Sequence, residues 1–295
     1  MPFYFCFFTY LTLCLCVSVV KINMSEHLKN LPFEAIEQNK KLTFPVKESN
    51  KSLFIGKLRY WWSLTFAGIL LLFVALPAMF VLQIINRRIW LYPLCVWGSM
   101  TWIRGSGINV KVSGRENLEK DKSYIFIANH RSYVDTTALF AYAGKRIGLI
   151  AKKELLKVPV LGQGISFINF VTIDRSNPER ALQTMENVRK IVEGGYSFGV
   201  FAEGTRAMPG ELLPFKKGAF HLALQTGAEI IPVAIKNTDY LMGKKTGVLQ
   251  PGTMEIVLLP PIETKNLSAE TDLVNLLKRT RAAIAEELGK AKVKR

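Results

Sequence analysis

Short apolar runs of β-favouring residues, which alternate with helical segments, constrain the fold of this chain more than any other feature of its sequence. The pattern begins near residue 106. Several runs are apolar throughout, which is typical of strands buried on both faces of a sheet. Strands that alternate with helices predict an α/β fold with a largely parallel sheet flanked by helices. The predicted strands are INVKVSG, SYIFIAN, GLIAK, FVTID, SFGVFAEG, IIPVAIKN and TMEIVLLP.

Three of the intervening helices have readable ends. Asn177-Pro178 predicts the start of one helix, because proline suits the first helical turn, and Gly194-Gly195 predicts its end. A second helix is predicted from Lys217 to Gly227 and a last one from Ser268 to Gly289. We therefore interpret residues 106–295 as one α/β domain.

The N-terminal 60 residues divide into two parts. Residues 1–20 are almost wholly apolar but lack the clear positive segment and cleavage site of a secretory signal. Two interpretations of residues 1–23 stay open: a membrane segment, or a mis-assigned start with Met24 as the true first residue. Residues 24–60 are polar and mixed in charge, and they predict a loose lead-in.

Residues 61–105 predict a pair of membrane-anchoring helices. Trp61–Ile85 carries no charge and is long enough to cross a bilayer core, with a kink expected at Pro77. Ile89–Ile103 is too short to cross and rich in tryptophan, which suits a membrane interface. We expect the pair to anchor the chain to one leaflet. A single span followed by an interfacial segment is the alternative.

The net charge of +16 predicts an anionic partner. The chain is also 49% hydrophobic, with the excess near its N-terminus. This combination favours membrane lipids over nucleic acid, because an anionic leaflet attracts lysine and arginine next to a membrane helix. Zinc-finger spacing and a basic heptad region are absent from the sequence, so no nucleic-acid partner is expected. The chain is predicted to be membrane-associated, at the cytoplasmic face of the inner or plasma membrane.

His130 and Asp135 form the first candidate catalytic pair. His130 follows the predicted strand SYIFIAN, and sites in open α/β sheets gather beyond the carboxyl ends of strands. An imidazole titrates near neutral pH and can take a proton from a hydroxyl, while a carboxylate bonded to its second nitrogen orients it. The structural alternative is a helix capping box with Ser132 as N-cap and Asp135 at the third helical position. The two roles are compatible.

Three further strand ends carry polar residues. SFGVFAEGTR ends in Glu203, Gly204, Thr205 and Arg206, of which Arg206 can bind a phosphate through two hydrogen bonds. FVTIDR ends in Asp174 and Arg175, and GLIAKK ends in Lys152 and Lys153. Together with His130, these ends predict a site for a phosphorylated substrate that bears a hydroxyl group.

Four segments of the chain resemble the 1-acyl-sn-glycerol-3-phosphate acyltransferase family. They occur in the order of that family's motif blocks and cover most of residues 120–240. The His-x4-Asp spacing gains specificity from the F-x-E-G-T-R sequence downstream. The segments are NHRSYVD, AKKELLKVPVLGQGISFINFVTIDRSN, VFAEGTRAMPGELLPFKKGAF and IIPVAIKN.

The resemblance implies transfer of a fatty acyl group from acyl-CoA or acyl-carrier protein to lysophosphatidate, giving phosphatidate. It implies that His130 is the general base, that Asp135 orients it, and that Pro232 is structural. It also implies an N-terminal helix pair before an α/β domain. The implied substrate-binding residues are Lys152, Arg175, Glu203, Gly204, Thr205 and Arg206.

No metal or other cofactor is expected, because acyl-CoA or acyl-carrier protein acts as a co-substrate. The four cysteines, Cys6, Cys14, Cys16 and Cys95, lie in apolar stretches, so neither a disulfide framework nor a metal cluster is predicted. One alternative function keeps the chemistry with glycerol-3-phosphate or another lysophospholipid as acceptor. A different class is a non-catalytic membrane protein that binds phospholipid, although binding alone needs no base.

Overall fold

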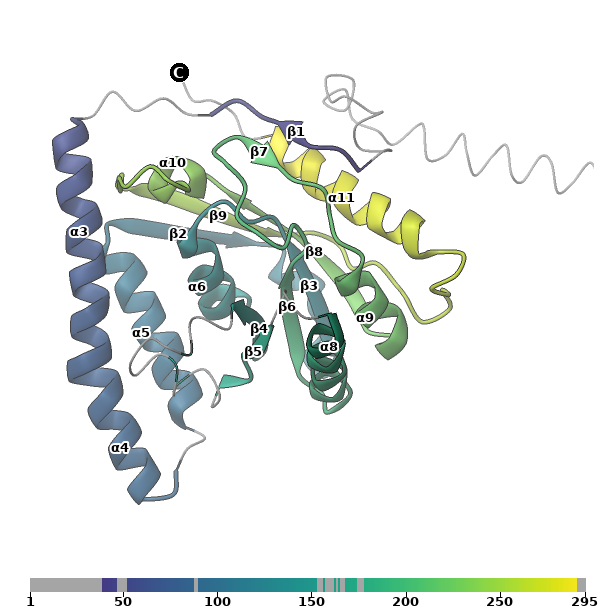
Figure 1. The fold of residues 1–295 in the computed structure, drawn as a ribbon, viewed down its shortest axis with the longest axis horizontal. Coiled ribbons are helices and arrows are strands. Elements are labelled where there is room, and N and C mark those ends of the chain that lie inside the picture. The colour runs from purple at the N-terminus through teal and green to yellow at the C-terminus, as the bar shows by residue number, and fades with distance from the viewer. Residues whose placement is uncertain are drawn as a thin grey trace, which may run out of the picture.

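A seven-stranded sheet forms the centre of the molecule in the computed structural model, which describes residues 39–46, 52–87, 90–152, 156, 162, 164, 168–173 and 178–290 (Figure 1). The strand order is β2-β9-β8-β3-β6-β4-β5. All neighbouring pairs are parallel except β8–β9. The predicted α/β fold with a largely parallel sheet and all seven predicted strands are therefore confirmed. The strands are β2 (Ile108–Ser113), β3 (Tyr124–Ala128), β4 (Ile147–Lys152), β5 (Val171–Ile173), β6 (Ser197–Phe201), β8 (Glu229–Lys236) and β9 (Gly252–Leu258).

Helices cover both faces of the sheet and divide its core into two clusters (Figure 1). The first cluster contains residues of α5, α6 and α10, and the second contains residues of α8, α9 and α11. Every residue of β3 is buried, which explains its unbroken apolar sequence. The helices over the sheet are α5 (Leu91–Gly105), α6 (Tyr133–Tyr142), α8 (Pro178–Glu193), α9 (Gly218–Thr226), α10 (Thr238–Met242) and α11 (Leu273–Gly289).

The predicted helix ends agree with the structure except at the start of α11. Gly195 and Gly227 follow α8 and α9 in left-handed backbone conformations, which glycine adopts without a Cβ penalty. Helix α11 begins at Leu273 rather than at Ser268. The reason is a turn in which the Asp272 carboxylate accepts a hydrogen bond from the backbone N–H of Ser268.

The predicted N-terminal helix pair is present. Helices α3 (Leu53–Leu70) and α4 (Leu76–Ile84) are continuous through a π-helical turn, η2 (Leu71–Ala75). Together they form one helix of 32 residues that is long and apolar enough to cross a membrane. The π-helical turn ends two residues before Pro77, whose missing N–H and bulky ring disturb regular α-helical bonding.

Helix α5 packs along α3 through polar contacts as well as apolar ones. The hydroxyl groups of Ser63 and Ser106 lie 2.7 Å apart, and Trp102 Nε1 donates to the carbonyl oxygen of Ser63 at 3.0 Å. A Cβ added at Gly105 would lie 2.2 Å from the Phe66 ring. The absence of a side chain at Gly105 therefore allows the two helices to approach closely.

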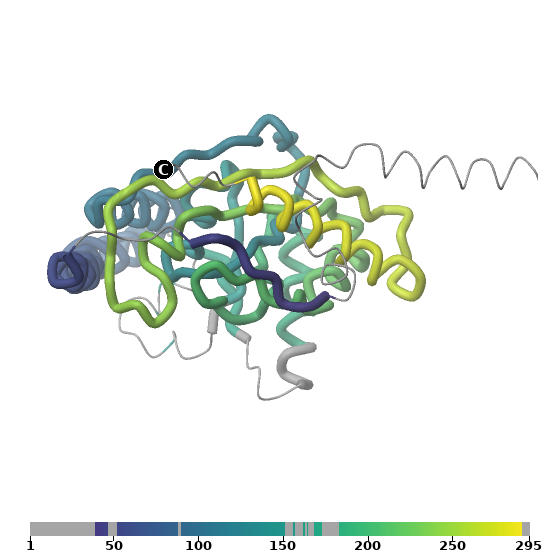
Figure 2. The backbone as a smooth tube through the Cα atoms, turned by 90° about the horizontal axis from the view of Figure 1, so that it is seen from above, coloured from purple at the N-terminus to yellow at the C-terminus, as the bar shows by residue number. Residues whose placement is uncertain are grey.

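An N-terminal strap, residues 39–46, lies against the α/β domain beside α11 (Figure 2). Its strand β1 (Leu42–Thr43) pairs with β7 (Glu211–Leu212) in an antiparallel arrangement. Leu42 is 1% exposed, and the Asn39 side chain exchanges two hydrogen bonds with the backbone of Phe215. This part of the lead-in is thus packed and paired, contrary to the prediction of a loose segment.

The proposed boundaries at residues 23, 60 and 105 stay predictions. Residues 1–38, which include the apolar stretch and Met24, lie outside the described residues.

Candidate active site

The candidate site lies at the carboxyl ends of the neighbouring parallel strands β3 and β6. Asn129 and His130 follow β3, and Glu203 lies two residues after the end of β6. The Asn129 side chain is buried and exchanges two hydrogen bonds with the backbone of Ile235 on β8, at 2.9 and 2.8 Å. This pair of bonds fixes the turn from which His130 projects.

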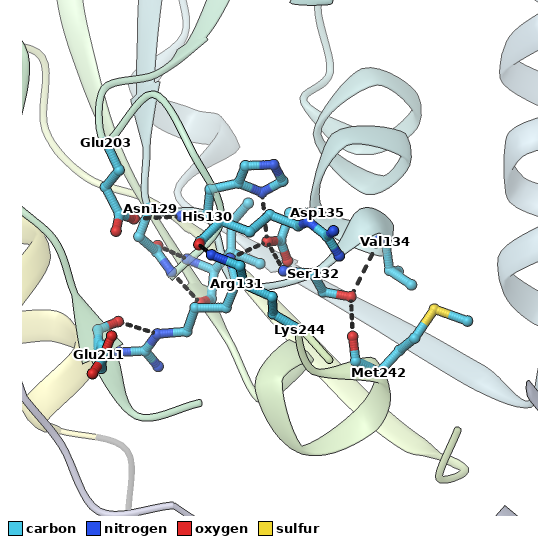
Figure 3. A network of polar contacts seen from close by, with 12 residues as sticks. Asn129, His130, Arg131, Ser132, Val134, Asp135, Glu203, Glu211, Met242 and Lys244 are labelled. Atoms are coloured by element: carbon cyan, nitrogen blue, oxygen red, sulfur yellow. Dashed lines mark hydrogen bonds and ion pairs between the residues drawn. The ribbon is translucent and has the colours of Figure 1, made fainter. Parts of the chain in front are cut away.

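His130 and Asp135 lie within hydrogen-bond distance of each other (Figure 3). His130 Nδ1 is 3.0 Å from Asp135 Oδ2. The same oxygen accepts backbone hydrogen bonds from Arg131 at 2.6 Å and Ser132 at 2.7 Å. Ser132 is the N-cap of α6, and both bonds of the predicted capping box are present. The geometry therefore places Asp135 as a helix cap and as a partner of His130 at once.

The His130 ring is held in one orientation and remains reachable. It stacks on Phe201, with ring centroids 4.1 Å apart and an interplanar angle of 23°. The side chain is 15% exposed. When Nδ1 donates to Asp135, Nε2 carries the lone pair on the side of the ring away from that carboxylate (Figure 3). Such a ring can accept a proton from a substrate.

Glu203 is buried and bonded to the backbone on both sides. Its Oε1 accepts from the N–H of His130 at 2.6 Å, and its Oε2 accepts from the N–H of Leu213 at 2.8 Å. Burial raises the pKa of the Glu203 carboxyl to about 7, while the two N–H donors act in the opposite direction. Because the Glu203 carboxylate is buried and bonds the backbone of His130 and Leu213, we interpret Glu203 as a brace for the His130 turn.

The other residues of the EGTR turn (Glu203–Arg206) lie close to the His130 turn. Gly204 has a φ of +69°, a left-handed conformation that favours glycine. Thr205 is exposed, and the Arg206 guanidinium lies 3.5 Å from the centroid of the Tyr133 ring. The next residue, Ala207, donates its N–H to the carbonyl oxygen of His130 at 2.7 Å. The structure thus brings the EGTR turn and the His130 turn together.

Two of the predicted substrate-binding side chains, those of Lys152 and Arg175, lie outside the described part of the structure. Lys152 is the last residue of β4, but its side chain is outside the described part of the structure. Arg175, with Lys153 and Asp174, also lies outside the described residues.

Arg131 and Asp239 connect the site to neighbouring segments and were missed by sequence reasoning. Arg131 is 5% exposed, and its NH1 lies 3.0 Å from Asp239 Oδ2. Its Nε donates to the carbonyl oxygen of Glu211, and Gly210 donates its N–H to the same carboxylate of Asp239. These bonds hold the loop after the EGTR turn against the His130 turn.

An apolar cavity of about 300 Å³ lies between the helix pair and α6. Thr136 and Thr137, which directly follow Asp135 in the sequence, form part of its wall. The other lining residues are Ala67, Leu70, Leu71, Val74, Ala75, Leu94, Cys95, Trp97, Gly98, Ser99, Trp102, Phe140, Ile168 and Phe170.

Comparisons with known proteins show which proteins this chain is similar to. A family model described as Acyltransferase matches residues 109–236. The chain is 40% identical over 183 residues to a 1-acyl-sn-glycerol-3-phosphate acyltransferase of Limnanthes douglasii, covering 61% of this chain and 63% of that protein. It is 41% identical over 187 residues to the Saccharomyces cerevisiae protein of the same name, covering 61% and 60%. The chain therefore spans somewhat less than two thirds of the curated relatives it matches.

A solved structure is also similar over most of the chain. It is the 1-acyl-sn-glycerophosphate (LPA) acyltransferase PlsC from Thermotoga maritima. The TM-score is 0.69 at 26% sequence identity, and the match covers 82% of this chain and 99% of that chain. The fold similarity therefore extends beyond the residues of the family model.

Proposed function

We propose that this chain, whose residues 109–236 match the Acyltransferase family model, transfers a fatty acyl group from a thioester donor to the sn-2 hydroxyl of lysophosphatidate. The products are phosphatidate and a free thiol. The observation that carries the proposal is the His130–Asp135 pair at the carboxyl end of β3, with the EGTR turn bonded to it. The names of the relatives support lysophosphatidate as the acceptor.

His130 acts as general base in this reaction. Its Nε2 takes the proton of the acceptor hydroxyl while the hydroxyl oxygen attacks the thioester carbon. The tetrahedral intermediate collapses, the C–S bond breaks, and the thiolate leaves with the proton returned by the imidazolium. Because a thioester is already activated, neither a covalent enzyme intermediate nor a metal or other cofactor is required. The donor is acyl-CoA or acyl-carrier protein.

Asp135 stabilises the imidazolium that forms during the reaction. Its carboxylate faces Nδ1 at 3.0 Å and is itself held by the backbone N–H groups of Arg131 and Ser132. Glu203 supports the same turn through the N–H of His130. A base held by this many fixed bonds needs little reorganisation when the proton moves.

Arg206 binds the acceptor phosphate. The bond from Ala207 N–H to the His130 carbonyl holds the backbone next to Arg206 against the His130 turn, and a guanidinium can donate two parallel hydrogen bonds to a phosphate. Gly204 lets the backbone approach the ligand closely, and Thr205 offers an exposed hydroxyl. Lys152 and Arg175 are proposed as further phosphate contacts on their sequence positions.

The apolar cavity receives an acyl chain. Its wall is almost entirely apolar and includes Thr136 and Thr137, one and two residues beyond Asp135. It is bounded by the exposed helix pair, which supports entry of a lipid chain from the membrane. The chain is proposed to work at the cytoplasmic face of the inner or plasma membrane, with membrane lipids as partners.

The decisive test is acyl transfer by the full-length protein reconstituted in membranes, with His130→Ala beside the wild type. The acceptors are lysophosphatidate and glycerol-3-phosphate, with oleoyl-CoA and oleoyl-acyl-carrier protein as donors. Turnover on lysophosphatidate that is lost in a folded His130→Ala protein supports the proposal. Turnover on glycerol-3-phosphate alone would show that glycerol-3-phosphate, and not lysophosphatidate, is the acceptor. Lipid binding without turnover would favour the non-catalytic alternative.

A further inference from the structure

Lys244 reaches the candidate site from a segment outside all four motif blocks. It follows α10, and its Nζ donates a hydrogen bond to the carbonyl oxygen of Arg206. Figure 3 draws Lys244 in the same polar network as His130 and Asp135. A cation from a third part of the chain is therefore added to the EGTR turn.

The position of Lys244 is fixed by the cap of the catalytic helix. Ser132 Oγ donates to the carbonyl oxygen of Met242 at 2.6 Å, and Ser132 forms an isolated antiparallel bridge with Gly243. These contacts form a closed ring. Ser132 contacts Met242 and Gly243, Lys244 bonds to the carbonyl oxygen of Arg206, and Ala207 bonds to the carbonyl oxygen of His130. The contacts of Ser132 with Met242 and Gly243 thus fix the position of the Lys244 ammonium group.

Tyr133 gives Arg206 a platform. The guanidinium lies over the Tyr133 ring at 3.5 Å, while the residue Tyr133 is 58% exposed. Stacking engages the flat face of the guanidinium and leaves its N–H edge free to donate in the plane. That edge is the part that binds a phosphate in a bidentate manner.

The charges around this turn are unbalanced toward the positive. Within the part of the chain that the structure describes, no carboxylate forms an ion pair with Arg206 or Lys244. The Glu211 carboxylate interacts electrostatically with Lys244 but forms its ion pair with Lys41, at 2.9 Å. Asp135 and Glu203 are buried and bonded to backbone N–H groups. An anionic group of the ligand is therefore the natural counter-charge.

We propose that Lys244 is a second phosphate-binding cation, which joins Arg206 on its Tyr133 platform to bind the phosphate monoester of the acceptor. This inference rests on the proposed function and adds a residue that no motif block contains. A phosphate monoester carries nearly two negative charges at neutral pH, so two fixed cations favour it over the singly charged phosphate of a diester headgroup.

The test separates charge from positioning at Lys244. Lys244→Gln keeps an N–H donor for the Arg206 carbonyl but removes the charge, whereas Lys244→Arg keeps the charge. We expect Lys244→Gln to raise the KM for lysophosphatidate about tenfold, with kcat within about twofold of the wild type. Lys244→Arg should restore most of the affinity. Lys245→Gln is the matched control, because Lys245 is exposed and adjacent, and it should change neither constant.

A second readout keeps the proposal independent of turnover. Binding of radiolabelled lysophosphatidate in mixed micelles, without an acyl donor, should weaken in Lys244→Gln by a similar factor. Unchanged binding and KM in Lys244→Gln, or a loss confined to kcat, would overturn the role of Lys244. A wild type that binds lysophosphatidate but never acylates it would overturn the proposed function instead, so the two failures can be told apart.

Discussion

Replacing Asp135 by asparagine tests whether its carboxylate does more than cap α6. An asparagine oxygen at the position of Oδ2 can still accept from His130 Nδ1, Arg131 and Ser132. The amide NH2 then takes the position of Oδ1, which accepts no hydrogen bond from the described residues. The substitution should therefore keep the cap and the histidine tautomer and remove only the charge.

The expected loss in kcat follows from the distance between His130 and Asp135. An imidazolium and a carboxylate 3.0 Å apart attract each other by about 5.5 kcal/mol at an effective dielectric constant of about 20. The neutral amide oxygen retains a hydrogen bond of about 1–1.5 kcal/mol. About 4 kcal/mol of stabilisation is lost when the imidazolium forms, which lowers kcat about 10³-fold at about 1.4 kcal/mol for each factor of ten.

The assay is release of free thiol from oleoyl-CoA with lysophosphatidate as acceptor, measured beside thermal unfolding of the same samples. We expect Asp135→Asn to unfold close to the wild-type temperature. Asp272→Asn, at the N-cap of α11, is the matched control and should retain full turnover. A loss of turnover smaller than about tenfold in a folded Asp135→Asn protein would show that Asp135 is only a helix cap.

Three further predictions concern the phosphate, the acyl chain and pH. Arg206→Lys should raise the KM for the acceptor about tenfold at nearly constant kcat, because the bidentate fork is lost; an unchanged KM would count against the phosphate role. Gly98→Phe fills the cavity, since a Cβ there meets no atom within 4 Å, and should favour shorter acyl donors about tenfold. Gly68→Phe, equally open but not on the cavity wall, is its control. Burial raises the pKa of Glu203 to about 7, so the folded chain keeps a proton that the unfolded chain releases, and stability should fall as pH rises from about 5 to about 7.5. Glu203→Gln should flatten that slope in thermal melts, and equal slopes would refute the reasoning.

The sheet could be predicted from sequence because the buried strands consist almost entirely of apolar residues. Strand β3 is apolar at every position and buried at every position, and β8 behaves almost the same. The local cap of Ser132 and Asp135 was readable for a similar reason, since its two residues lie three positions apart. Structural features formed by residues close together in the sequence can therefore be predicted from one segment alone.

The contacts that complete the site have no such local signal. Arg131 and Asp239 are 108 positions apart, and the bond from Lys244 to Arg206 crosses 38 positions. Neither residue type nor spacing indicates these pairs before the chain is folded. Glu203 shows the same limit, because its sequence position suggested a ligand contact, while its hydrogen bonds to His130 and Leu213 depend on the tertiary structure.

The N-terminal strap constrains the path of the chain through a bilayer. Leu42 is buried in the α/β domain before the helix pair begins, and β2 enters the same domain directly after the pair ends. A single complete crossing would leave these two points on opposite sides of the membrane. Helix α5, with 15 residues, is about 22 Å long, shorter than a hydrocarbon core of about 30 Å. Inserted in a bilayer, the helix pair would therefore enter and leave by one face, to a depth limited by the shorter helix α5.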